Sequence, residues 1–112
     1  MKKPIQRFIA KDKIKELYRF LMLSKKHSNE FDFSAKYSDV EIIDDNVLLV
    51  TFLGARYKAT IRYDAWVHDR FDITLYSNGN FGFEMVTQAF AETCRETLTV
   101  IGKLITSGFI NG

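Results

Sequence analysis

The chain has 112 residues, of which 46% are hydrophobic and 14% aromatic, enough to bury one core and to exclude a disordered tail. A single cysteine, Cys94, excludes an internal disulfide and a cysteine-based metal site, and no apolar run is long enough to span a bilayer. The charge is uneven, because residues 1–26 hold nine bases and two acids, whereas residues 27–112 hold seven bases and twelve acids. We expect one domain over residues 1–112, located in the cytoplasm because no signal peptide is recognisable.

Apolar residues recur at helical spacing in the first 26 residues, but the spacing slips by one residue between Ile9 and Ile14. We therefore predict a short structured lead-in, followed by a helix over residues 12–26 with Asp12 as its N-terminal cap. The predicted apolar stripe of this helix contains Ile14, Leu17, Tyr18, Leu21 and Met22.

Alternating polar and apolar side chains over residues 28–43 predict the first strand, and the polar residues 44–46 predict a turn after it. Residues 47–53 are apolar on both faces, which is typical of a strand that is covered on two sides. We therefore expect that the two terminal helices do not both lie on the same face of the sheet.

The alternation is cleanest over residues 56–67, which predict a strand with one apolar and one polar face. The polar face of this strand carries Arg56, Lys58, Thr60, Arg62, Asp64 and Trp66. A reversal at residues 68–69 leads to the next predicted strand, over residues 71–75. The dipeptide Asn78-Gly79 then gives the strongest hairpin signal in the chain.

A short last strand over residues 81–83 and a second helix over residues 84–105 complete the prediction. The helix is indicated by apolar residues that recur three and four positions apart. Its predicted inner stripe contains Val86, Ala89, Phe90, Thr93, Cys94, Thr97, Val100, Ile101 and Leu104. The order of elements predicts an α+β fold, with an antiparallel sheet of four to five strands, one N-terminal helix and one C-terminal helix.

Two groups of basic residues are candidate binding surfaces, one on the first helix and one on the strand over residues 56–67. Such surfaces neutralise phosphates, and a neighbouring aromatic such as Trp66 can stack on a base. A nucleic-acid-binding module would use Lys11, Lys15, Arg19, Lys25, Lys26, Arg56, Lys58 and Arg62. The alternatives for the helix are a solvated face, pairing with the chain's own carboxylates such as Asp44 and Asp45, and an acidic surface of another protein. The alternative for the strand is an edge protected by its charges.

The densest cluster of titratable groups contains Asp64, His68 and Asp72, residue types that can bind a metal or transfer protons. We interpret this cluster as a polar hairpin, because a hairpin separates the three side chains and no second motif completes a site. Cys94 lies on the apolar side of the second predicted helix and is interpreted as a structural residue. We therefore expect no catalytic residue, no metal and no cofactor, and hence a protein that is not an enzyme.

Residues 73–81, Ile-Thr-Leu-Tyr-Ser-Asn-Gly-Asn-Phe, resemble a recurrent segment of small bacteriophage proteins. In those proteins an apolar strand is followed by a Ser-Gly-rich reversal, an aromatic residue and a threonine-rich helix start. Thr87 corresponds to those threonines, whereas the basic residue that follows them is missing here. The resemblance implies a phage or mobile-element origin. Small phage proteins of this kind often bind and block host machinery, including nucleases of defence systems.

These features predict a small binding protein, a phage or mobile-element inhibitor that docks on a host or defence protein in the manner of an anti-CRISPR protein. Trp, Tyr and Arg are the usual energetic anchors of such interfaces. The residues predicted to bind the partner are Arg62, Trp66, Arg70 and Tyr76. The nucleic-acid-binding module is the alternative, no membrane partner is expected, and the sequence leaves monomer and homodimer open.

Overall fold

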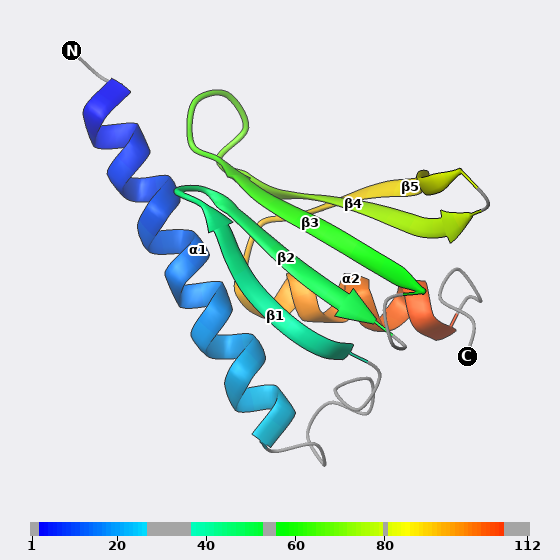
Figure 1. The fold of residues 1–112 in the computed structure, drawn as a ribbon. Coiled ribbons are helices and arrows are strands. Elements are labelled where there is room, and N and C mark those ends of the chain that lie inside the picture. Colours follow the sequence, from blue (N-terminus) through cyan, green and yellow to red (C-terminus); the bar gives the residue numbers. More distant parts are fainter. Residues whose placement is uncertain (1–2, 27–36, 53–55, 80, 107–112) are drawn as a thin grey trace.

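A helix, five antiparallel strands and a second helix follow one another along the chain (Figure 1). The computed structural model describes residues 3–26, 37–52, 56–79 and 81–106. The elements are α1 (Lys3–Lys26), β1 (Tyr37–Asp44), β2 (Val47–Phe52), β3 (Tyr57–Asp64), β4 (Arg70–Gly79), β5 (Gly82–Ala91) and α2 (Cys94–Thr106). Each strand pairs with the next one, so the sheet order is β1-β2-β3-β4-β5. The predicted α+β fold with two terminal helices is confirmed.

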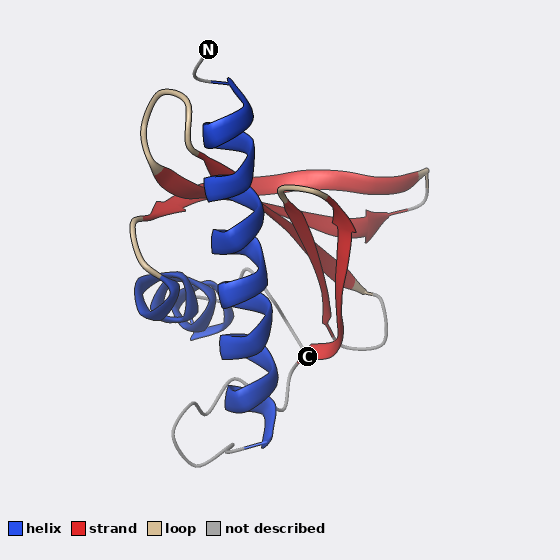
Figure 2. Ribbon diagram, turned by 90° about the vertical axis from the view of Figure 1, so that its left-hand side faces the viewer, coloured by secondary structure: helices blue, strands red, loops and turns tan. Residues whose placement is uncertain are grey.

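Both helices pack against the same face of the sheet, which we call the inner face (Figure 2). Neither helix covers the other face, which we call the open face. The prediction that the helices lie on different faces is therefore wrong. Val47 points to the open face and is nevertheless buried, and it lines a hollow there together with Ile43 and Arg62. The core contains Ala10, Ile14, Leu17 and Leu21 of α1, Leu48, Val50 and Phe52 of β2, Ala59, Ile61 and Tyr63 of β3, Phe71, Ile73 and Leu75 of β4, and Leu98, Ile101 and Leu104 of α2.

Helix α1 is continuous from Lys3, so the predicted start at Asp12 is wrong. Its buried stripe begins at Ala10, and the apolar residues before it lie off this stripe, with Phe8 68% exposed. The first turns extend past the sheet in Figure 1, where no strand covers them. The slip in spacing therefore marks where the helix leaves the sheet, not a break in the helix. Met22, predicted in the stripe, is exposed.

Strand β5 contradicts the prediction of a helix from residue 84, because residues 82–91 pair with β4 along their length. The register shifts between Leu75 and Tyr76, which leaves Val86 as the extra residue of a β-bulge. The bulge breaks the two-residue period and places apolar residues at a spacing that resembles a helix. The helix begins only at Cys94, after Thr93, whose hydroxyl accepts a hydrogen bond from the Glu96 N–H at 3.0 Å.

The hairpin between β3 and β4 starts earlier than predicted, because β3 ends at Asp64 and residues 65–68 form a turn. Asp69 follows with a positive φ of 51°. The predicted hairpin at Asn78-Gly79 is present, but both residues belong to β4, where Gly79 pairs with Gly82, so the reversal follows them. The predicted strand residues 28–36, the segment 53–55 and the side chains of Lys25 and Lys26 lie outside the described residues.

Candidate functional site

The open face presents every second residue of the strands in three rows across the sheet. The register aligns these rows as Thr51-Lys58-Tyr76-Met85, Leu49-Thr60-Thr74-Gln88 and Val47-Arg62-Asp72-Phe90. Because β3 lies in the middle of the five strands, its cations do not protect a sheet edge, and the edge-strand interpretation is wrong. They lie instead at the centre of the face that the helices leave uncovered.

A hollow of about 540 Å³ lies in the open face, at the end where β1 turns into β2. Its lining combines the apolar Ile43 and Val47 with the cation of Arg62 and the carboxylates of Asp44 and Asp72. Positively charged, negatively charged and apolar side chains therefore line the same hollow. The remaining lining residues are Thr60, Thr74 and Tyr76. Such a hollow can hold a side chain of a partner that has both polar and apolar parts.

Two cations of the open face lie over exposed aromatic rings of β5. The Lys58 Nζ atom is 4.0 Å from the centre of the Phe83 ring, and the Arg70 guanidinium carbon is 3.7 Å from the centre of the Phe90 ring. The Arg70 Nε atom also donates a hydrogen bond to Asp72 Oδ1 at 3.0 Å. Cation–π contacts of this kind contribute about 0.5–1 kcal/mol each at exposed sites. They hold both the cations and the rings in place on the surface.

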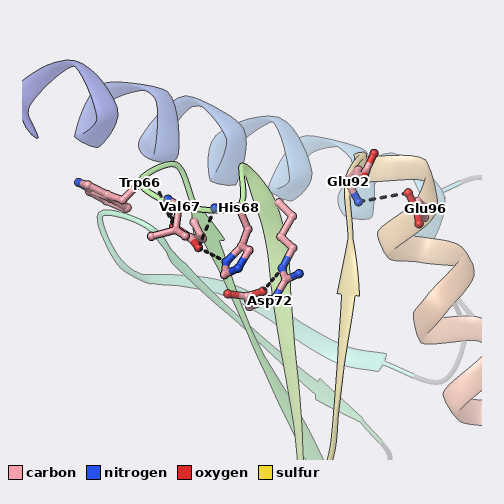
Figure 3. A network of polar contacts seen from close by, with 8 residues as sticks. Trp66, Val67, His68, Asp72, Glu92 and Glu96 are labelled. Atoms are coloured by element: carbon pink, nitrogen blue, oxygen red, sulfur yellow. Dashed lines mark hydrogen bonds and ion pairs between the residues drawn. The ribbon is translucent and has the colours of Figure 1, made fainter. Parts of the chain in front are cut away.

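Trp66 lies apart from this face, in the turn between β3 and β4. The Asp64 carboxylate accepts hydrogen bonds from the backbone N–H groups of Trp66, Val67 and His68 at 3.0, 3.1 and 3.3 Å. The Trp66 ring is 42% exposed, and Figure 3 shows it directed away from His68 and Asp72. The turn is thus organised by one carboxylate and presents its indole at the end of the sheet.

Of the four residues predicted to bind a partner, the structure brings three onto the open face. Arg62, Arg70 and Tyr76 lie there on β3 and β4, while Trp66 does not join them. Sequence reasoning missed the exposed apolar residues beside them, which are Ile43, Phe83, Met85 and Phe90. For Phe90 the reason is the bulge in β5, which gave it the spacing of a residue in the inner stripe of a helix.

The basic residues of α1 form a stripe with a spacing of four residues along one flank of the helix. Arg7, at its start, forms an ion pair with Asp45, so part of the predicted pairing with the chain's own carboxylates is present. The hydrogen bond and charge of Arg7 lower the pKa of Asp45, and those of Asp45 raise the pKa of Arg7. The rest of the stripe, Lys11, Lys15 and Arg19, is exposed.

The two groups of basic residues lie on opposite sides of the sheet. Helix α1 packs on the inner face, whereas Lys58 and Arg62 project from the open face and Arg56 lies just before β3. A nucleic-acid strand running along α1 would reach Arg62 only by passing round the β1 edge, where the hollows that border Lys11 and Arg62 share Ile43 and Asp44. Asp72 stands directly opposite Arg62 on the neighbouring strand, which weakens the attraction of Arg62 for phosphate.

The cluster of Asp64, His68 and Asp72 is divided between two contacts. The His68 Nδ1 atom lies 3.0 Å from Asp64 Oδ2, while Asp72 is bound by Arg70. Burial alone would raise the pKa of Asp64, but the hydrogen bonds from Val67, His68 and Trp66 outweigh it and lower this pKa. Within the described ranges, no three His, Cys, Asp or Glu side chains converge in an arrangement that could hold a metal ion.

Cys94 is buried at the start of α2, and burial raises the pKa of its thiol to about 11. The thiolate is the reactive form, so its fraction is small at neutral pH. We expect Cys94 of the native protein to react with a disulfide reagent such as DTNB at pH 8 about 10²-fold more slowly than Cys94 of the unfolded chain. Stopped-flow absorbance with and without guanidinium measures both rates. Equal rates would contradict the burial of this thiol.

Comparison with models of protein families, with curated proteins and with solved structures gives no match to this chain. Among the described segments, neither helix combines the length and the apolar character that a bilayer crossing requires. The open face is therefore chosen as the candidate site from its geometry alone, that is, from its hollow and from the aromatic border formed by Phe83 and Phe90.

Proposed function

We propose that this chain is a non-enzymatic binding protein that docks on another protein through the open face of its sheet. The observation that carries the proposal is the set of exposed Phe83, Met85 and Phe90 beside Arg62 and Arg70 on one uncovered face. Aromatic residues, Met and Arg are the types enriched at the centres of protein interfaces. The hollow with groups of both signs offers a place for a partner's anchor residue.

The class of partner rests on the resemblance of residues 73–81 to bacteriophage proteins. That segment forms most of β4, which supplies Tyr76 and Thr74 to the hollow. We propose a host or defence protein as the partner, with the chain acting as an inhibitor that works by occupying a surface, in the manner of an anti-CRISPR protein. To occupy a surface, the chain needs only a face that is complementary to it in shape and charge. An interface of standard size needs about 20–30 residues on each side.

A nucleic-acid-binding module is the second candidate, and the exposed stripe of Lys11, Lys15 and Arg19 favours it. Four-residue spacing aligns these cations on one flank of α1, where they can neutralise neighbouring phosphates. Arg7 is already engaged by Asp45, however, and the cations of β3 lie on the other side of the sheet. The geometry therefore favours a protein partner at the open face over a nucleic acid at α1.

Two charge reversals separate the candidates. We expect Arg62→Glu, on the open face, to weaken binding to the protein captured by the wild-type chain from a bacterial host lysate at least tenfold, and Tyr76→Ala to have a similar effect. The matched control, Arg19→Glu, makes the same change of charge on α1 and should leave this affinity unchanged. Calorimetry with the purified partner measures all three.

Measuring oligonucleotide binding at two salt concentrations tests the nucleic-acid candidate. If Arg19→Glu abolishes a salt-dependent affinity for oligonucleotides while Arg62→Glu leaves every affinity intact, the nucleic-acid function replaces the proposed one. The identity of the captured protein tests the partner class, since a protein outside host machinery or defence would contradict it.

A further inference from the structure

Strand β5 is an edge of the sheet that carries few of the features that usually protect an edge. It is ten residues long, pairs only with β4 among the described strands, and contains Glu84 as its single charged residue. Natural proteins usually protect such an edge with lysines, prolines or a covering element, because its free backbone N–H and C=O groups can pair with another chain. The bulge at Val86 is the only such feature in β5, and neither lysine nor proline occurs in it.

The opposite edge, β1, is shorter and carries more charge. Its eight residues contain three carboxylates, those of Asp39, Glu41 and Asp44. The lysines of α1 also approach it, since Lys11 and Lys15 border a hollow of about 240 Å³ together with residues of β1. An edge that is less protected than its opposite is the one more open to pairing with another chain.

The side chains near the β4–β5 turn add apolar surface to this free edge. Phe81 is 96% exposed and Met85 is 60% exposed, and Phe83 and Val86 are also exposed. This hairpin projects away from α1 in both overall views (Figures 1 and 2). Apolar surface therefore coincides with a strand edge that none of the described strands pairs with.

We infer that β5 pairs antiparallel with the β5 of a second copy of this chain, which joins the two sheets across a two-fold axis. Antiparallel pairing of a strand with itself is isologous, so the same surface serves both partners. On the open face, Phe83 and Met85 lie near the start of β5 and Phe90 lies near its end. The antiparallel direction brings the start of one strand against the end of the other, so apolar residues meet apolar residues.

The charges of β5 fit the same arrangement. Glu84 lies in the first half of the strand and would face the second half of the partner strand, residues 88–91, which carries no charge. A parallel pairing in register would place the two Glu84 carboxylates side by side, which is destabilising. The position of Glu84 thus favours antiparallel pairing of the two β5 strands over parallel pairing. The dimer would present two open faces on one continuous sheet, whichever partner they bind.

The mass of the full chain in solution tests this inference. We expect light scattering to give twice the chain mass of 13.0 kDa, and the Met85→Lys variant to give 13.0 kDa. The control Phe8→Lys also places a lysine at an exposed apolar site, but on α1, and should remain dimeric. Thermal unfolding confirms that each variant is folded. A wild-type mass of 13.0 kDa throughout a dilution series, or a dissociated Phe8→Lys, would overturn the inference.

Disulfide trapping in a Cys94→Ala background tests the direction of pairing. Val86 lies at the middle of β5, so Val86→Cys comes within disulfide range of its own copy when the strands run antiparallel. Phe83→Cys would lie roughly 20 Å from its copy in that arrangement. We expect oxidation to cross-link Val86→Cys and not Phe83→Cys. Cross-linking of both variants would indicate parallel pairing in register, and cross-linking of Phe83→Cys alone would contradict pairing centred on the middle of β5. Neither readout involves the partner of the open face, so this inference and the proposed function can fail separately.

Discussion

The Phe71→Ala variant is expected to lose about 3–5 kcal/mol of unfolding free energy, the largest effect of any substitution considered for this fold. Phe71 is fully buried on the inner face of β4, between the sheet and the helices. Its ring meets that of Tyr63, its cross-strand partner, edge to face, with centroids 4.9 Å apart and planes at 71°. Removing the ring leaves a cavity and also ends this aromatic contact, which accounts for about 0.5–1.5 kcal/mol of the loss.

Denaturation in urea followed by circular dichroism measures this loss. Phe8→Ala is the matched control, because it makes the same chemical change at a position that is exposed on α1. It should change the free energy of unfolding by less than about 0.5 kcal/mol. A domain of this size has a total stability of about 5–15 kcal/mol, so Phe71→Ala leaves a small margin or none. Similar losses in both variants would mean that Phe71 does not lie in the core.

The Asp64→Ala variant is expected to lose about 2 kcal/mol, because three backbone N–H groups and the His68 ring lose their common acceptor. The turn at residues 65–68 should loosen, and the environment of Trp66 should change with it. Trp66 is the only tryptophan of the chain, so its fluorescence reports on this turn alone. Asp64→Asn keeps one oxygen acceptor and should lose less.

The contribution of Asp64 should also depend on pH. Its pKa is lowered in the folded protein, so the unfolded chain takes up the proton first as the pH falls. The stabilisation is therefore present above the unfolded pKa of about 3.9 and is lost as the pH falls through the folded pKa. The difference in unfolding free energy between wild type and Asp64→Asn should shrink below about pH 4. A difference that stays constant down to acid pH would assign no role to this carboxylate.

The proposed binding face and the proposed dimer edge are neighbouring surfaces with a physical link. Lys58 and Arg70 belong to the open face, yet their cations lie over the rings of Phe83 and Phe90 on β5. Pairing of two β5 strands would fix these rings and, with them, the cations. A dimer would also present two hollows to one partner assembly, and two linked sites raise the effective affinity when geometry allows both to bind.

The sequence misassigned β5 for a physical reason. Val86, Ala89 and Phe90 recur at positions i, i+3 and i+4, which is the spacing of a helix face. In the sheet, Val86 is the extra residue of the bulge and has no partner residue on β4. Ala89 therefore lies on the inner face and Phe90 on the open face, opposite regularly spaced residues of β4. Local spacing cannot separate a bulged strand from a helix. The place of Phe90 in the aromatic border of the candidate site was hidden for the same reason.

The alternation in residues 57–63 and 71–75 was sufficient to predict two strands, their inner faces and the cations on the opposite face. A two-residue period is a local property of the chain, so no distant contact is needed to establish it. Only the tertiary structure decided that both helices share the inner face and that β3 lies at the centre. Val47 is buried without a helix above it, in a hollow of the open face that Ile43 and its cross-strand partner Arg62 also line. Burial on both faces therefore did not require two covering layers, and the face left open became the candidate site.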